Sequence, residues 1–283
     1  MTQSKMSTTS VVVVALGIIG IIVVSTILTE SRAVMQTIRG GYASAGLSAL
    51  NSTSPQVSST NMNPVATPLP TVLELVGSTE DYECPEHLVL VEDSIDPSFY
   101  EKPELKIPKV VHMTSRSRCM TQAFANNVDK WRFKGFSLFV HDDDAVDRLV
   151  NRQWPEFPQL QDTLKCMVPG AAMADLWRYM MIWSFGGIYT DIDNAPGPWL
   201  WNETGSVITN ETDALFEQER DGFPSQYFFA ASPHHPVMFL AVYQLMHRVM
   251  DVASVQRQYV PFVTGPGAIK KAFVRITLYF LPV

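Results

Sequence analysis

Short apolar stretches of two kinds alternate along the second half of the chain. Residues 109–112 (KVVH) and 136–140 (FSLFV) are short, largely apolar stretches of strand length, and each is followed by polar residues. Residues 145–154 and 237–249 instead carry apolar side chains at helical spacing. Strands that alternate with helices across short Gly, Pro and Asp turns predict an α/β domain with a largely parallel sheet. The same reasoning predicts helices over 124–131 and from 268 to 273, and strands over 226–231, 260–263 and 276–283.

The most informative pattern lies at residues 174–196, which read ADLWRYMMIWSFGGIYTDIDNAP. We predict a helix that begins at Pro169 and ends near Phe185, because proline is pre-organised at a helix start. Two consecutive glycines then tolerate the left-handed backbone that commonly ends a helix. A short strand follows and leads directly into Asp191 and Asp193.

Asp191 and Asp193 are separated by one residue, so on a strand their side chains would point to the same side. At the carboxyl end of a strand in an open α/β sheet, that side faces the ligand-binding crevice. Two carboxylates suit Mg²⁺ or Mn²⁺, which leave further positions to water and phosphate. The alternative is a solvated pair at a strand end, in which Asp193 or Asn194 caps the next turn.

A second Asp-x-Asp spacing occurs at Asp142 and Asp144, which follow the apolar run 136–140. Three consecutive aspartates directly before a helix are favoured by N-capping and by the helix dipole. We therefore interpret this acidic run as a helix cap.

Asp175 and Arg178 lie one turn apart on the predicted central helix, which is otherwise apolar. An arginine held in a dry site supplies fixed hydrogen-bond donors for a developing negative charge. The alternative is a surface ion pair, which would stabilise the helix by only ~0.2–0.5 kcal/mol. The apolar surroundings favour a functional role.

The histidines and cysteines give weaker signals. His112 ends a predicted strand, and a structural role and a ligand contact both stay open. His234 and His235 are adjacent on a loop and cannot both easily face one metal ion. Cys84, Cys119 and Cys166 are compatible with one disulfide and one thiol, in any pairing, and no zinc-ligand spacing occurs.

Composition limits the function classes. The chain has 283 residues, 46% hydrophobic residues and a net charge of −7, which is enough for one substantial core. Because no basic stripe is present, nucleic acid is not an expected partner.

Residues 11–28 form an uninterrupted apolar run that would span about 27 Å as a helix, close to the hydrocarbon depth of a membrane. A cleaved signal peptide is the alternative, with Ser31 and Ala33 as small residues before the cut. We favour an uncleaved anchor. The expected organisation is a cytosolic tail at 1–10, a transmembrane signal anchor at 11–28, a largely flexible stem at 29–104 and a folded domain at 105–283.

Three Asn-x-Thr/Ser sequons, at Asn51, Asn202 and Asn210, all lie after the apolar run. Such sites are glycosylated only in the secretory lumen, so together they favour a lumenal body.

The motifs IPKVVH (107–112), ADLWRY (174–179), GGIYTDID (186–193), HP (235–236) and TGP (264–266) occur in this order. In this respect residues 105–273 resemble the family 32 glycosyltransferases with a DXD sugar-binding region. That family includes the fungal initiating α-1,6-mannosyltransferase and the mannosyltransferases of inositol phosphorylceramide. The resemblance implies a GT-A-like, Rossmann-like fold, a nucleotide-sugar donor (GDP-mannose favoured), a glycan or glycolipid acceptor, Mn²⁺ or Mg²⁺, transfer with retention, and a type II Golgi location.

The resemblance also implies roles for individual residues. Asp191 would contact the ribose or sugar of the donor, and Asp193, with Asp191, would hold the metal. Asp175 and Arg178 would bind the donor's sugar and nucleotide, and the loop after His112 would lie near the base. The turn at 264–267 is expected near the acceptor.

Two alternatives to an active transferase remain. Family members continue beyond the TGP turn, often with a histidine that completes the site, so the domain is expected to be truncated. This motivates a catalytically inactive lumenal subunit of a glycosyltransferase complex. A phosphatase with a nucleophilic aspartate is the other alternative, but it gives no role to Asp175 and Arg178.

Overall fold

The computed structural model describes residues 11–13, 71–79, 82–100, 105–167, 170–197, 200–202, 205–252 and 260–280. The chain forms two compact units, one of residues 1–14 with 68–283 and one of residues 15–67. The second unit lies outside the described residues.

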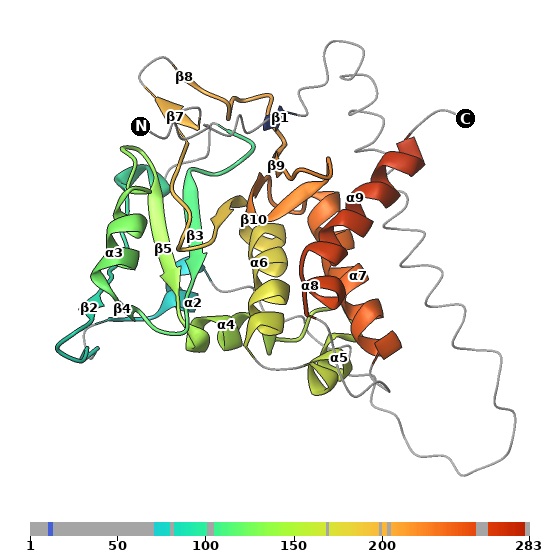
Figure 1. Ribbon diagram of the computed structural model, residues 1–283, viewed down its shortest axis with the longest axis horizontal. Coiled ribbons are helices and arrows are strands. Elements are labelled where there is room, and N and C mark those ends of the chain that lie inside the picture. Colours follow the sequence, from blue (N-terminus) through green and yellow to red (C-terminus); the bar gives the residue numbers. More distant parts are fainter. Residues whose placement is uncertain are drawn as a thin grey trace, which may run out of the picture. The chain divides into compact units, whose positions relative to one another are not determined.

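A mixed sheet forms the centre of the first unit (Figure 1). Within the described residues it has six strands, in the order β1-β9-β10-β6-β3-β5. Their bounds are β1 Val11–Val13, β3 Val110–Thr114, β5 Ser137–His141, β6 Gly187–Thr190, β9 Ala214–Gln218 and β10 Pro224–Ala231. Two small antiparallel pairs accompany it, β2 Val89–Leu90 with β4 Cys119–Met120, and β7 Trp201–Asn202 with β8 Gly205–Ser206.

The predicted α/β class is confirmed, but the prediction of a largely parallel sheet is wrong. Strand β3 pairs in parallel with β5 and β6, whereas β10 runs antiparallel to both β6 and β9. The short connection between β9 and β10 explains the antiparallel pairing of these two strands, because it forms a hairpin.

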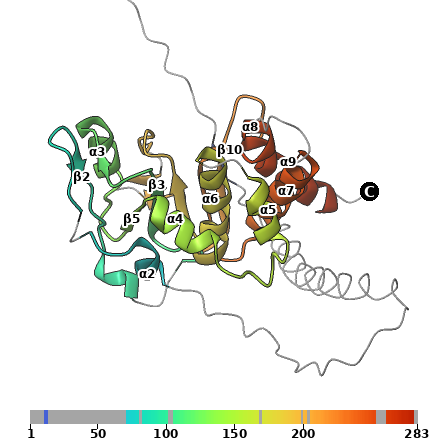
Figure 2. The same ribbon diagram turned by 90° about the horizontal axis from the view of Figure 1, so that it is seen from below.

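Helices cover both faces of the sheet (Figure 2). On β5, Leu138 and Val140 pack in one core cluster with Val128 of α3, while Phe139 packs in another with Val72 of α2. Alternate strand residues thus face opposite layers. Helices α4, α6, α7 and α9 form one connected layer, in which α4 contacts α6, α6 contacts α7, and α7 contacts α9. The helix bounds are α2 Val72–Val76, α3 Gln122–Asp129, α4 Asp143–Val150, α5 Leu160–Cys166, α6 Ala171–Phe185, α7 Pro236–Val252, α8 Val260–Val263 and α9 Pro266–Phe280, with a 3-10 turn at Pro97–Tyr100.

The acidic run before α4 is a helix cap, as predicted. Asp142 is the N-cap residue, and its carboxylate accepts a hydrogen bond from the Ala145 N–H at 2.8 Å. The two strands predicted at the C-terminal end are wrong in the part that the structure describes. Residues 260–263 form α8, and residues 276–280 continue α9. Short apolar runs do not distinguish a strand from a buried helical turn.

The folded unit begins before residue 105, where the sequence placed its start. Val72, Leu75 and Val76 of α2 are buried, and Arg148 of α4 donates to the carbonyls of Leu75 (2.7 Å) and Val76 (3.2 Å). The last carbonyls of α2 therefore receive their hydrogen bonds from the domain itself.

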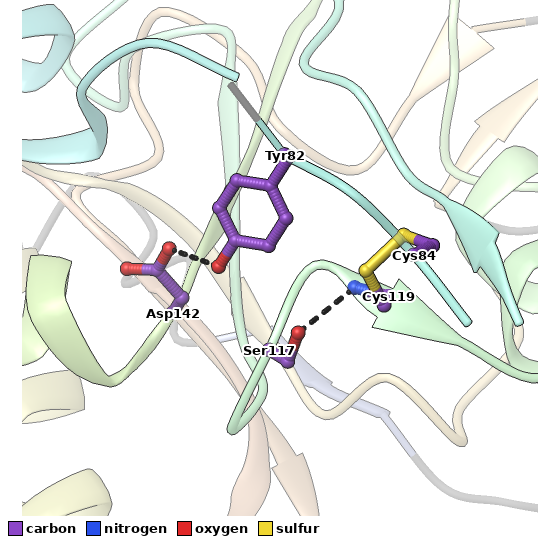
Figure 3. The surroundings of a disulfide bond; sticks show 5 residues. All are labelled: Tyr82, Cys84, Ser117, Cys119 and Asp142. Carbon is purple, nitrogen blue, oxygen red and sulfur yellow. Dashed lines mark hydrogen bonds between the residues drawn. A yellow bond between two sulfur atoms is a disulfide. The ribbon is translucent and has the colours of Figure 1, made fainter. Parts of the chain in front are cut away.

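A disulfide joins Cys84 to Cys119 across this added segment (Figure 3). Close to it, the Tyr82 hydroxyl donates to Asp142 Oδ2 at 2.8 Å. The sequence left the pairing of the three cysteines open. In the structure, Cys166 is outside the disulfide.

Of the apolar run 11–28, the structure describes only Val11–Val13. These residues form β1, paired antiparallel with β9, instead of the first turn of the predicted helix. Consecutive valines favour extended backbone, because branching at Cβ restricts their side chains in a helix. The rest of the predicted anchor lies outside the described residues. Among the helices that are described, none has the length and apolarity needed to cross a membrane.

Candidate functional site

The reversal from α6 to β6 depends on two glycines. Gly186 and Gly187 have φ angles of +68° and +98°, which side chains other than glycine rarely adopt. A Cβ on Gly186 would also lie 2.6 Å from Cδ of Pro233. The helix can therefore turn directly into the strand, as predicted, and the charged residues of α6 come close to the carboxyl end of β6.

Asp191 and Asp193 lie in a turn immediately after β6, which ends at Thr190. The Asn194 N–H donates to the carbonyl of Asp191 at 3.1 Å and closes this turn. The Asp191 N–H and the Asn194 side chain both donate to the carbonyl of Tyr227, each at 3.0 Å. The two carboxylates are thus not on the strand itself, and the argument from strand pleating does not apply to them.

Helix α3 and the segment that directly follows it also support this turn. Asn127 Nδ2 donates to the carbonyl of Asp193 at 3.3 Å, and the buried indole of Trp131 donates to the carbonyl of Asn194 at 3.1 Å. With its backbone held, Asp193 presents an exposed side chain. Within the described residues, that carboxylate makes no hydrogen bond or ion pair.

Arg178 is the centre of a buried polar cluster on the other side of the turn. Its Nη1 donates to Asp191 Oδ1 at 3.1 Å and to the carbonyl of Gln226 at 3.2 Å, and its Nη2 lies 3.4 Å from Asp175 Oδ1. Its guanidinium also stacks over the ring of Tyr189, 4.6 Å from the centroid. Burial lowers the pKa of Arg178, but the neighbouring Tyr189, Asp191 and Asp175 raise it above its ordinary value. The side chain therefore stays charged.

Asp175 is almost completely buried, and both of its carboxylate oxygens accept hydrogen bonds. Gln226 Nε2 donates to Oδ1, and Thr264 Oγ1 donates to Oδ2, each at 2.8 Å. Burial raises the pKa of the Asp175 carboxyl, while Arg178, Thr264 and Gln226 act in the opposite direction. The predicted pair of Asp175 and Arg178 is therefore part of an interior network and not a surface ion pair.

Tyr189 of β6 is buried, and its hydroxyl belongs to the same polar cluster. Its hydroxyl donates to Asp191 Oδ1, the oxygen that Arg178 also contacts. Sequence reasoning also missed Gln226 and placed Thr264 near the acceptor. For Thr264 the TGP motif was a usable signal, whereas nothing in the sequence distinguishes Gln226.

His112 is buried apart from this cluster. Its Nδ1 lies 3.2 Å from Nε2 of His141, and its Nε2 would lie 3.4 Å from a Cβ on Gly187. Burial lowers the pKa of His112 to about 3, although the backbone of Gly186 acts in the opposite direction, so the ring is neutral. The structure does not bring His112 to Arg178 or Asp191, and its contact with a donor stays a prediction.

His234 and His235 lie in the loop before α7. The ring of His234 packs edge-on against Trp183, with centroids 4.9 Å apart, and His235 Nδ1 accepts from the Val237 N–H at 3.3 Å. Within the part of the chain that the structure describes, no three His, Cys, Asp or Glu side chains are grouped closely enough to hold a metal ion.

Part of the chain is similar to known proteins. Residues 72–206 match the family described as glycosyltransferase sugar-binding region containing DXD motif. The mannosyl phosphorylinositol ceramide synthase CSH1 of Saccharomyces cerevisiae is 22% identical over 181 residues, 63% of this chain and 44% of that protein. The initiation-specific alpha-1,6-mannosyltransferase of Schizosaccharomyces pombe is 26% identical over 188 residues, 58% of this chain and 44% of that protein.

The inositol phosphoceramide mannosyltransferase 1 of Schizosaccharomyces pombe is 22% identical over 145 residues, 50% of this chain and 43% of that protein. The chain thus spans less than half the length of these curated relatives. Among solved structures, the PaToxG glycosyltransferase aligns with a TM-score of 0.40 and 14% identity, over 61% of this chain and 74% of that one. The resemblance to the DXD glycosyltransferases that the motifs indicated is confirmed.

Proposed function

We propose that this chain, whose residues 72–206 match the sugar-binding region of the DXD glycosyltransferases, is a metal-dependent glycosyltransferase with a GT-A-like fold. It transfers a sugar from a nucleotide-sugar donor to a glycan or glycolipid acceptor. The donor contacts are Asp175, Arg178 and Asp191, the carboxylates of Asp193 and Asp191 hold the metal, and the loop after His112 lies near the base.

One observation carries the proposal: a buried arginine and an exposed carboxylate flank the same turn. Arg178 reaches this turn through Asp191, and Asp193 projects from its other end. A nucleotide sugar has both matching parts, because sugar and ribose hydroxyls bind carboxylates and a guanidinium, whereas a diphosphate binds a metal ion. Neither a solvated acidic pair nor a surface ion pair would require so many buried hydrogen bonds behind it.

The donor set fits Mn²⁺ or Mg²⁺. Among the residues that the structure describes, the carboxylate of Asp193 has no hydrogen-bond or ion-pair partner, and Asp191 accepts hydrogen bonds on Oδ1 only. These ions commonly bind through one or two carboxylates and complete their shell with water and substrate phosphates. A bound ion would act as a Lewis acid and neutralise charge on the diphosphate leaving group.

The protein residues act by holding fixed charge in place. Loss of the diphosphate from the sugar leaves negative charge on the leaving group and positive charge at the sugar. Arg178 cannot lose its proton and is held by acceptors from α6, β10 and the turn after β6, so little reorganisation is needed during the reaction. The Tyr189 hydroxyl fixes Oδ1 of Asp191 and leaves Oδ2 for the metal ion and a hydroxyl of the donor.

The finer assignments are part of the same proposal. Two of the yeast relatives are named as mannosyltransferases and the third as a mannosyl phosphorylinositol ceramide synthase. These names support mannose as the sugar and GDP-mannose as the donor. We also propose transfer with retention, an N-terminal membrane anchor and a Golgi location with the catalytic domain in the lumen.

The test is hydrolysis or transfer by the full-length protein, with a panel of nucleotide sugars and with or without Mn²⁺. We expect Mn²⁺-dependent turnover of GDP-mannose by the wild type. Asp193→Ala should lower this turnover by at least about a hundredfold, since a metal ion contributes several kcal/mol of transition-state stabilisation. Asp144→Asn is the matched control, because Asp144 is an exposed aspartate in the other Asp-x-Asp sequence. Full activity of Asp193→Ala, or no binding of any nucleotide sugar by the wild type, would contradict the proposal.

A further inference from the structure

Thr264 connects the C-terminal helices to the site. It lies in the corner between α8 and α9, 89 positions after Asp175 in the sequence. Its hydroxyl donates to Asp175 Oδ2 at 2.8 Å, the shorter of two contacts, since the carbonyl of Val260 lies 3.2 Å away. Both residues are buried, with 1% of Thr264 and 5% of Asp175 exposed. This contact is buried and joins residues distant in sequence, so the corner must have a fixed position relative to α6.

The corner is fixed by its own hydrogen bonds and by α6. The N–H groups of Thr264 and Gly265 both donate to the carbonyl of Val260, at 3.0 and 2.9 Å, and the Tyr179 hydroxyl of α6 donates to the carbonyl of Gly265 at 3.1 Å. A Cβ on Gly265 would lie 2.9 Å from Cα of Pro261. The backbone of the TGP motif is therefore packed against α6 one turn after Asp175.

Thr264 has a distinct part in holding the carboxylate of Asp175. Gln226 and Arg178 contact Oδ1, whereas Thr264 is the donor to Oδ2 within the described residues. Donors on both oxygens prevent the carboxylate from rotating, so Oδ1 stays directed at Arg178. The guanidinium of Arg178 is in turn directed at Asp191.

We propose that Thr264 is a positioning residue for the donor, which acts through Asp175 and Arg178 on the carboxylate of Asp191. The inference rests on the proposed function, because it assigns Arg178 and Asp191 as donor contacts. The sequence suggested that the turn at 264–267 lies near the acceptor. In this proposal the turn instead supports the donor site through Thr264.

The test compares Thr264→Val, which keeps the shape of the side chain but removes its hydroxyl, with Thr264→Ser, which keeps the hydroxyl. We expect the donor KM of Thr264→Val to rise on the order of tenfold, as for loss of a hydrogen bond to a charged group. Thr264→Ser should stay close to the wild type. A variant that only folds less well would lower kcat and leave KM unchanged.

Thr163→Val is the matched control. Thr163 is equally buried, and its hydroxyl donates at 3.0 Å to the carbonyl of Gln159, the N-cap residue of α5. Its substitution should lower stability but not change the donor KM. A wild-type KM in Thr264→Val, or an equal rise in Thr264→Ser and Thr264→Val, would overturn the inference.

A second measurement does not depend on activity. In urea unfolding of the full-length protein, Thr264→Val and Asp175→Asn should shift the midpoint non-additively, whereas Thr163→Val and Asp175→Asn should be additive. If the wild type binds no nucleotide sugar, the proposed function fails, and additive shifts for Thr264 and Asp175 would then overturn the coupling as well.

Discussion

Arg178 and Asp191 are 13 positions apart in the sequence, on either side of the glycine turn, and Nη1 of the arginine donates to Oδ1 of the aspartate at 3.1 Å. The bond joins the middle of a buried helix to the turn after the neighbouring strand. The two aspartates of the motif therefore have different surroundings, since the Asp191 carboxylate is bound by protein side chains and Asp193 is exposed. The two residues should therefore respond differently to substitution.

Arg178→Lys should lose most of the activity, even though the charge is kept. The guanidinium contacts Asp175, Asp191 and the carbonyl of Gln226 at once, and a lysine ammonium cannot reproduce this planar arrangement. We expect a loss of about a hundredfold or more in kcat/KM.

Arg178→Ala should in addition destabilise the fold by about 3–5 kcal/mol, because Asp175 would be left as a buried, partly uncompensated carboxylate. Donor kinetics and urea unfolding of both variants check this pair of expectations. Normal kinetics of Arg178→Lys would mean that the guanidinium geometry is not used.

Tyr189→Phe should lower kcat/KM by roughly tenfold and destabilise the fold by about 1.5–3 kcal/mol. The substitution keeps the buried ring beneath Arg178 and removes only the hydroxyl that donates to Asp191, a bond to a charged group worth about 1.5–3 kcal/mol. Tyr179→Phe removes another buried hydroxyl, the one that donates to the carbonyl of Gly265, and offers a comparison with equal loss of atoms. Equal activity of Tyr189→Phe and wild type would show that Asp191 needs no such support.

Reduction of the disulfide should destabilise the domain. Cys84 and Cys119 are 35 positions apart, and closing a loop of this size typically stabilises a protein by about 2–4 kcal/mol. We expect the double variant Cys84→Ser, Cys119→Ser to show a lower urea midpoint that no longer responds to a reducing agent. Cys166→Ser should keep the wild-type response to reduction, and a wild-type midpoint in the double variant would contradict the expectation.

Stability should fall as the pH is lowered below about 6.5. The pKa of His112 is about 3 in the folded protein because burial disfavours the charged ring, and burial lowers the pKa of His141 as well. The unfolded chain binds these protons near pH 6.5 and the folded chain does not. The stability contributed by neutral His112 is therefore complete above pH 6.5 and is lost progressively toward pH 3.

For His112 this corresponds to about 2 kcal/mol between pH 7.5 and pH 5. Urea unfolding at several pH values should show this slope in the wild type and a smaller slope in His112→Asn. Identical slopes in the two proteins would show that His112 is not the titrating group.

The unit formed by α6 and β6 was predictable because its information is local. The glycine pair, the apolar helix and the Asp-x-Asp sequence specify a helix end, a strand and an acidic turn within a few residues. Contacts of Asp175 with Gln226 and Thr264 were not predictable, since these partners lie 51 and 89 positions away and depend on the packing of β10 and α9. The antiparallel half of the sheet was missed for a similar reason. Strand β9 was not recognised, so β10 could not be identified as one arm of a hairpin.

The turn at 191–194 keeps its shape through groups other than the carboxylate of Asp193. Its main chain is bound by a side-chain amide of α3, by an indole N–H just after α3 and by the backbone carbonyl of Tyr227 in β10. Chemistry and architecture are thus separable here: Asp193 can be exchanged for a neutral or longer acidic side chain while the loop that displays it persists. On the proposed function, metal preference is then expected to respond to substitution of Asp193 alone, with the scaffold unchanged.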